Sequence, residues 1–105
     1  EGAEAVRAAS HPNVKLVADL YHMLRENENP DAIIKAGNLI RHVHVAEEAN
    51  RTPPGVYGDD FRPFLGSLNK ISYQGNFSIE SRWEDLLMQV GPAVTELRRQ
   101  LADVN

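Results

Sequence analysis

Three short strand-like segments, separated by helix-forming stretches, constrain the fold of this chain more than any other feature. They cover residues 14–18, 39–45 and 76–80, and the first is a largely apolar run of the kind that is buried on both faces of a sheet. Strands that alternate with helices are joined by right-handed crossovers and lie parallel to one another. The sequence therefore predicts an α/β fold with three parallel strands.

Four helices are expected to alternate with these strands, over residues 2–9, 31–36, 61–70 and from residue 83 onward. The second has clear boundaries, because Asn29 and Pro30 are typical of a helix start and Gly37 is typical of a helix end. The fourth repeats apolar residues at helical spacing. Gly91 and Pro92 predict that this helix bends or restarts partway along its length.

The segment between the second strand and the third helix has too many helix and strand breakers for regular structure. Residues 46–60 include Pro53, Pro54, Gly55 and Gly58. We expect a long surface loop here, and loops of this length are often functional.

A sheet of three strands cannot close into a barrel, because a closed eight-stranded α/β barrel usually needs about 250 residues. The chain has 105 residues, enough for a single domain over 1–105, and Glu1 opens directly into a helix-forming stretch without a methionine. We therefore expect a piece of a longer protein. An open sheet would expose two backbone edges and the apolar inner face of the barrel, so we expect a cover, either an unseen N-terminal half or a homo-oligomer partner.

Polar residues stand where each apolar strand finishes, namely Asp19, His44 and Glu80. The carboxyl ends of parallel strands converge on one mouth, where α/β folds carry their active sites. Two carboxylates and an imidazole suit an octahedral divalent ion with positions left open for a substrate. The chain has no cysteine, so Mn, Mg, Co or Zn is the expected metal. The alternative is that these residues only cap the helices that follow.

His42 and His44 lie two positions apart on the second strand, so their side chains point to the same face. His44 is nearer the strand end and can reach the mouth. His42 lies deeper, and we interpret it as a core histidine satisfied by hydrogen bonds or as a residue that supports a metal ligand. His11 precedes a proline in a loop and is expected to be a surface residue.

The charge balance excludes one class of partner, and the hydropathy pattern excludes another. The formal net charge is −4 and the arginines are scattered, so we expect no nucleic acid partner. No apolar run approaches the roughly 18 residues that a membrane span requires, and the first residues lack a signal-peptide pattern. We expect no membrane partner and a cytoplasmic location.

Several motifs in a fixed order make the chain similar to a known family. The chain resembles the sugar phosphate isomerase/epimerase family of xylose isomerase-like TIM barrels, which includes D-tagatose and D-psicose 3-epimerases and hydroxypyruvate isomerase. The resemblance runs from about His11 to Glu80. It is carried by Asp19-Leu20-Tyr21-His22-Met23, by His42-Val43-His44 followed by Asn50-Arg51 and Pro54-Gly55, and by Tyr73-Gln74-Gly75 leading to Ser78-Ile79-Glu80.

The resemblance implies a partial TIM barrel with strands six to eight, in the C-terminal portion of the family fold. It implies metal ligands at Asp19, His44 and Glu80, with a fourth ligand, a Glu on strand five, upstream of this chain. His22 and Arg51 would bind substrate oxygens, and Glu80 would also act as an acid/base group. Arg51 follows His44 by seven positions, one more than the epimerase pattern leads us to expect. A solvated loop arginine is therefore the alternative for Arg51, and a residue that caps or packs the start of its helix is the alternative for His22.

The resulting hypothesis is the C-terminal part of a divalent-metal-dependent sugar or sugar phosphate isomerase or epimerase. Glu80 would move a proton and the sugar would pass through an enediolate. The chain alone would be inactive, because the partner acid for the other face of the substrate lies upstream. Two alternatives stay open: an endonuclease-IV-like metal-dependent nuclease, and a noncatalytic α/β interaction domain in which the groups at the strand ends point apart.

Overall fold

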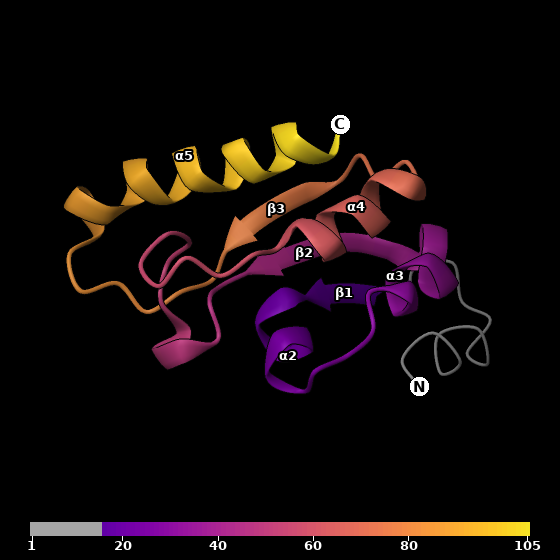
Figure 1. Ribbon diagram of the computed structural model, residues 1–105, viewed down its shortest axis with the longest axis horizontal. Coiled ribbons are helices and arrows are strands. Elements are labelled where there is room, and N and C mark those ends of the chain that lie inside the picture. Colours follow the sequence, from indigo (N-terminus) through magenta and orange to yellow (C-terminus); the bar gives the residue numbers. More distant parts are fainter. Residues whose placement is uncertain (1–15) are drawn as a thin grey trace.

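The computed structural model describes residues 16–105 and contains three parallel strands and four α-helices (Figure 1). This confirms the predicted α/β class. The predicted helix over residues 2–9, the first two residues of the first predicted strand and His11 lie outside the described residues. The strands are β1 Leu16–Asp19, β2 Ile40–Val45 and β3 Asn76–Ile79, in the spatial order β1-β2-β3. The helices are α2 Leu20–Arg25, α3 Asp31–Ala36, α4 Arg62–Lys70 and α5 Leu86–Val104, with short 3-10 turns η1 Gly37–Leu39 and η2 Ala49–Arg51.

The core lies between the sheet and its helices. Val43 and Val45 of β2 are fully buried, as alternating residues of a strand are when one face is covered. The apolar face predicted for the third helix is confirmed by four buried residues, Phe61, Phe64, Leu65 and Leu68. Other members of the same cluster are Leu20, Met23, Ile33, Ile40 and Leu97.

A bulge at the start of β2 decides which side chains face the core. Leu16 pairs with Ile40 and Val17 pairs with His42, so Arg41 is an extra residue without a partner on β1. The bulge shifts the alternation by one, and Ile40 can therefore face the core together with Val43.

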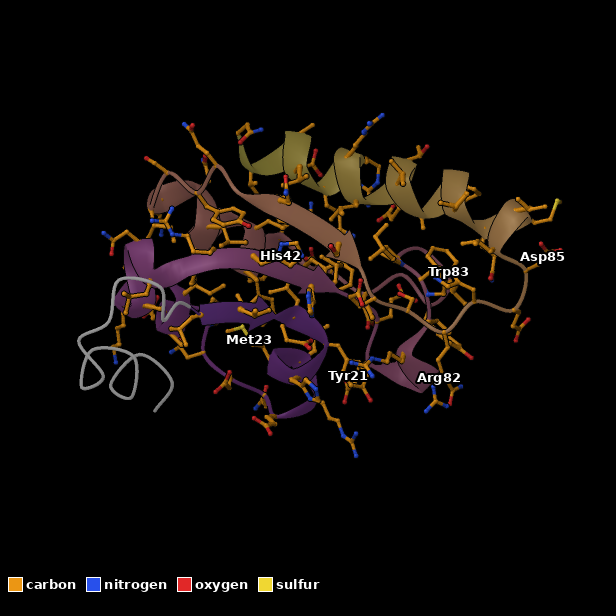
Figure 2. The ribbon with its side chains drawn as sticks, turned by 180° about the vertical axis from the view of Figure 1, so that it is seen from behind. Tyr21, Met23, His42, Arg82, Trp83 and Asp85 are labelled. Carbon is orange, nitrogen blue, oxygen red and sulfur yellow. The ribbon has the colours of Figure 1, made fainter. Side chains whose placement is uncertain are left out.

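The opposite face of the sheet is not covered by the described helices, and Figure 2 views it with His42 labelled. By strand alternation, this open face carries Val17, Asp19, His42, His44, Asn76 and Ser78. Its exposed apolar member is Val17, with 52% of its surface accessible. The predicted apolar inner face is therefore wrong. This face is mainly polar because the residues of the candidate site occupy it.

The helix boundaries follow local chemistry. The Asn29 side chain accepts a hydrogen bond from the Asp31 N–H at 2.9 Å, and Gly37 ends α3 with φ +55°. Asp85 caps α5 by accepting from the Met88 N–H at 3.3 Å, so this helix begins at Leu86, three residues after its predicted start.

The predicted restart in the last helix is wrong, because α5 is a single helix with Pro92 inside it. Proline removes the hydrogen bond to the Met88 carbonyl, and this part of the helix is exposed, so water can satisfy that carbonyl. No helix among residues 16–105 is long and apolar enough to cross a membrane.

Candidate active site at the strand ends

Asp19 has two roles at the end of β1, one for each carboxylate oxygen. Its Oδ1 accepts a hydrogen bond from the His22 N–H at 3.2 Å and so caps α2. Its Oδ2 lies 3.7 Å from His22 Nε2 and 4.0 Å from His44 Nδ1. Asp19 and His44 are paired across β1 and β2, which explains why they meet. The acid and the imidazole point toward one another, contrary to what the interaction-domain alternative predicts.

The pair formed by Asp19 and His44 would have to close slightly to hold one divalent ion. Neighbouring ligands of an octahedral ion with metal–ligand bonds of about 2.1 Å lie about 3 Å apart, whereas the two donor atoms here are 4.0 Å apart. A carboxylate oxygen and an imidazole nitrogen are common ligands of such ions. The side chains are 22% and 32% exposed, so an ion and a substrate can reach both.

Glu80 lies one residue beyond β3 and is exposed. Its N–H donates to the Val45 carbonyl at 3.0 Å, which continues the ladder past the strand end. Ser78 contacts His42 on the open face, and Glu80 follows two positions later, so strand alternation would direct its side chain to the same face. Among residues 16–105, however, no three His, Asp or Glu side chains are close enough to hold one metal ion. A shared cation at Asp19, His44 and Glu80 stays a prediction.

His42 supports the site from deeper in the sheet. Its Nε2 lies 2.7 Å from Ser78 Oγ, and its ring meets the His44 ring edge to face with centroids 5.0 Å apart. Both contacts restrict the two imidazoles, as expected for a hydrogen-bonded histidine beside a ligand.

Arg51 is not a freely solvated loop arginine. Its guanidinium carbon lies 4.6 Å from the centroid of the Tyr21 ring, a cation–π distance. Its Nε is buried and has no hydrogen-bond partner within the described part of the chain. The Arg51 carbonyl accepts from the Arg82 N–H at 2.8 Å. Asn50 and Arg51 both have positive φ, 57° and 56°, which is uncommon for residues other than glycine.

Glu47 organises the loop that carries Arg51, and no motif or spacing in the sequence pointed to it. Its side chain is fully buried. It accepts hydrogen bonds from Thr52 Oγ1 at 3.0 Å and from the N–H groups of Gly55, Tyr57 and Asp59 at 3.1, 2.7 and 2.9 Å. A buried carboxylate is stable only when it is hydrogen-bonded in this way, so the loop folds around it.

Gln100 of α5 fixes the far end of the same loop. Its Oε1 accepts from the Phe61 N–H at 2.7 Å, and its Nε2 donates to the Asp59 carbonyl at 3.0 Å and to Glu96 at 2.7 Å. Hydrogen bonds from Arg99 and then Gln100 lower the pKa of Glu96 to about 2. The loop between β2 and α4 is thus tied to a long helix as well as to its own buried acid (Figure 1).

Comparisons with known proteins agree on one fold and one class of reaction. A family model described as xylose isomerase-like TIM barrel matches residues 1–103. The D-psicose 3-epimerase of Enterocloster bolteae is 31% identical over 99 residues, which cover 93% of this chain and 31% of that protein. The D-psicose 3-epimerase of Agrobacterium fabrum is 35% identical over 81 residues, which cover 76% of this chain and 28% of that protein.

Solved structures of epimerases have the same arrangement of strands and helices. D-allulose 3-epimerase from Methylomonas sp., in complex with D-allulose, aligns with a TM-score of 0.82 and 25% identity over 94% of this chain and 41% of that one. The 3-keto-D-glucoside 4-epimerase from E. coli aligns with a TM-score of 0.80 and 27% identity over 93% of this chain and 38% of that one. The chain spans between 27% and 31% of the length of the curated relatives that it matches.

Proposed function

Because this chain belongs to the xylose isomerase-like TIM barrel family, we propose that it supplies part of the active site of a sugar isomerase or epimerase. The observation that carries the proposal is the placement of Asp19 Oδ2 between the His22 and His44 imidazoles at the strand ends. The names of the relatives favour a ketose substrate and a change of configuration at the carbon next to the carbonyl. The resemblance leaves open whether that ketose is phosphorylated.

Asp19, His44 and Glu80 would hold a divalent ion, with Mn, Mg, Co or Zn as candidates. The Asp19 and His44 donors lie 4.0 Å apart, and Glu80 directly follows β3 at the same end of the sheet. When bound, such an ion would polarise the carbonyl and hydroxyl oxygens of the sugar and make the neighbouring C–H more acidic.

The side chains of this chain would bind the sugar and move the proton. Glu80 is exposed at the mouth, where its carboxylate would remove the proton from the carbon next to the carbonyl or return a proton to it, with an enediolate between the two steps. Acid/base transfer of this kind contributes roughly 10²–10⁴-fold to the rate. His22, whose side chain is 55% exposed, and Arg51 would donate hydrogen bonds to sugar oxygens. A second acid for the other face of the substrate would come from outside this chain.

The sheet of this chain is open along β1 and β3, so we propose a cover from the rest of the barrel or from a second copy of the chain. Either cover would also enclose the polar open face. On this proposal the chain alone is inactive or nearly so.

The test uses the complete natural protein that contains this chain, assayed for C3 epimerisation of D-psicose and other ketoses. We expect activity that a chelator removes and a divalent ion restores. Glu80→Gln should lower kcat by at least 100-fold. Glu84→Gln changes an exposed acid four positions away and is the matched control. A folded protein that epimerises no ketose, or one in which Glu80→Gln and Glu84→Gln are equally active, would refute the proposal.

A further inference from the structure

We infer that Tyr21 is a positioning residue that fixes Arg51 and His22 at the mouth of the site. The inference rests on the proposed function, because it is that function which gives Arg51 and His22 a substrate to bind. Tyr21 is the second residue of α2, which Asp19 caps, and it is partly buried.

The first observation is the contact with the loop. The Tyr21 ring packs against the Arg51 guanidinium at 4.6 Å, although α3 and β2 lie between the two residues in the sequence. The backbone around Arg51 needs such support, because Asn50 and Arg51 are both in the left-handed region. Figure 2 shows Tyr21 and Arg82 beside the segment that follows β2. Ring and backbone contacts together hold Arg51 in one place.

The second observation is the contact with the helix start. The Tyr21 ring meets the His22 ring edge to face, with centroids 5.1 Å apart and planes at 68°. Its hydroxyl accepts a hydrogen bond from Arg25 Nη1 at 3.2 Å, which fixes the ring from the solvent side. His22 in turn approaches Asp19 Oδ2 at 3.7 Å.

These contacts form one continuous series across the site. It runs from Arg51 through Tyr21 to His22, and from there through Asp19 to His44. Tyr21 joins the loop to the strand ends, and both of its contacts in this series are made by its aromatic ring. The Arg51 guanidinium lies over the face of that ring and its Nε is buried, and these two constraints leave the group little freedom to turn. The terminal nitrogens of Arg51 would then be presented to a substrate in a fixed direction.

The test compares Tyr21→Leu, which removes the aromatic ring, with Tyr21→Phe, which keeps the ring and removes the hydroxyl. Tyr57→Leu is the matched control, because Tyr57 is a tyrosine of the same loop region with 60% of its surface exposed. Side-chain NMR of Arg51 in the full chain should show ring-current shifts in the parent and in Tyr21→Phe that disappear in Tyr21→Leu. The complete protein should show a KM for D-psicose raised roughly 3- to 30-fold by Tyr21→Leu, the range of a cation–π contact, with a smaller change in kcat.

A double variant guards against a loss that only reflects poorer folding. Arg51→Ala removes the cation that Tyr21 holds, so adding Tyr21→Leu to it should raise KM by less than Tyr21→Leu does alone, and the remaining rise is the effect on His22. Unchanged Arg51 shifts in Tyr21→Leu would overturn the inference, as would Tyr21→Phe behaving like Tyr21→Leu or additive effects on KM. If the complete protein epimerises no ketose, the proposed function fails, and the NMR comparison alone then decides whether Tyr21 holds Arg51.

Discussion

Replacing Glu47 by glutamine should destabilise the chain far more than replacing its neighbour Glu48. Each Glu47 oxygen accepts two hydrogen bonds, Oε1 from Thr52 and Tyr57 and Oε2 from Gly55 and Asp59. An amide has one oxygen and one NH2 group, so two of these donors must face another donor. The less costly orientation places the NH2 at the Oε1 position, because the Thr52 hydroxyl can turn and accept.

That orientation still leaves the Tyr57 N–H without an acceptor in a buried place, at a cost of about 1–3 kcal/mol. The remaining bonds also lose the charge of the carboxylate, which brings the total to about 2–4 kcal/mol. Glu48→Gln should change the unfolding free energy by less than about 0.5 kcal/mol, because the Glu48 side chain is exposed.

Chemical denaturation gives the unfolding free energy, and amide hydrogen exchange shows where the loss occurs. The Gly55, Tyr57 and Asp59 amides should exchange much faster in Glu47→Gln than in the parent chain. If Glu47→Gln is as stable as Glu48→Gln and these amides stay protected, the buried acid is not what organises the loop.

Three further predictions concern stability and the cap. The pKa of Glu96 is low, about 2, so its contacts with Arg99 and Gln100 stabilise the fold above about pH 4.5 and lose their effect as the pH falls toward 2. Glu96→Gln should therefore reduce the loss of stability between pH 6 and pH 2 by about 1 kcal/mol, measured by denaturation across that range. Gly37→Ala should lower the unfolding free energy by about 1 kcal/mol in thermal unfolding, because φ at this residue is +55°, even though nothing lies within 4 Å of the new methyl group. The control is Gly66→Ala in α4, which should leave stability unchanged or raise it. Asp19→Asn should keep the cap of α2 and leave the unfolding free energy within about 0.5 kcal/mol, while the metal affinity measured by calorimetry falls at least tenfold. If the unfolding free energy falls as much as the binding free energy, the two oxygens do not have separate roles.

The strands of this molecule, and the edge of the sheet at which they end, could be predicted from the sequence. The strands lie within two residues of the predicted ranges because apolar runs and breakers are local signals. The meeting of Asp19 and His44 followed from one general rule, that parallel strands end at the same edge of a sheet. Glu80 was placed at that edge by the same rule, and it directly follows β3 in the structure, while its approach to the other two residues stays a prediction.

The contacts that join distant segments could not be predicted in this way. Periodicity places Tyr21 on a helix and Arg51 in a loop, and nothing local indicates that they stack. Glu47 is one acid in a segment with several polar residues, and only the folded loop shows that its side chain is buried. The bulge at Arg41 reverses the expected alternation over one residue, and it depends on the neighbouring strand rather than on β2 itself.

An acid at the end of a strand was interpreted either as a helix cap or as a metal ligand, and the cap that Asp19 forms also directs the oxygen that the second interpretation needs. A carboxylate is planar and has two acceptor oxygens, so fixing one of them also fixes the direction of the second. The bond from the His22 N–H to Oδ1 is local, and it forms because α2 begins directly after β1. Once it has formed, Oδ2 must face across the strand ends, where the register of β1 and β2 has already placed His44. The start of a six-residue helix is therefore what aims the candidate ligand. Changes that lengthen the connection between β1 and α2 should disturb the site even when they leave each of its side chains in place.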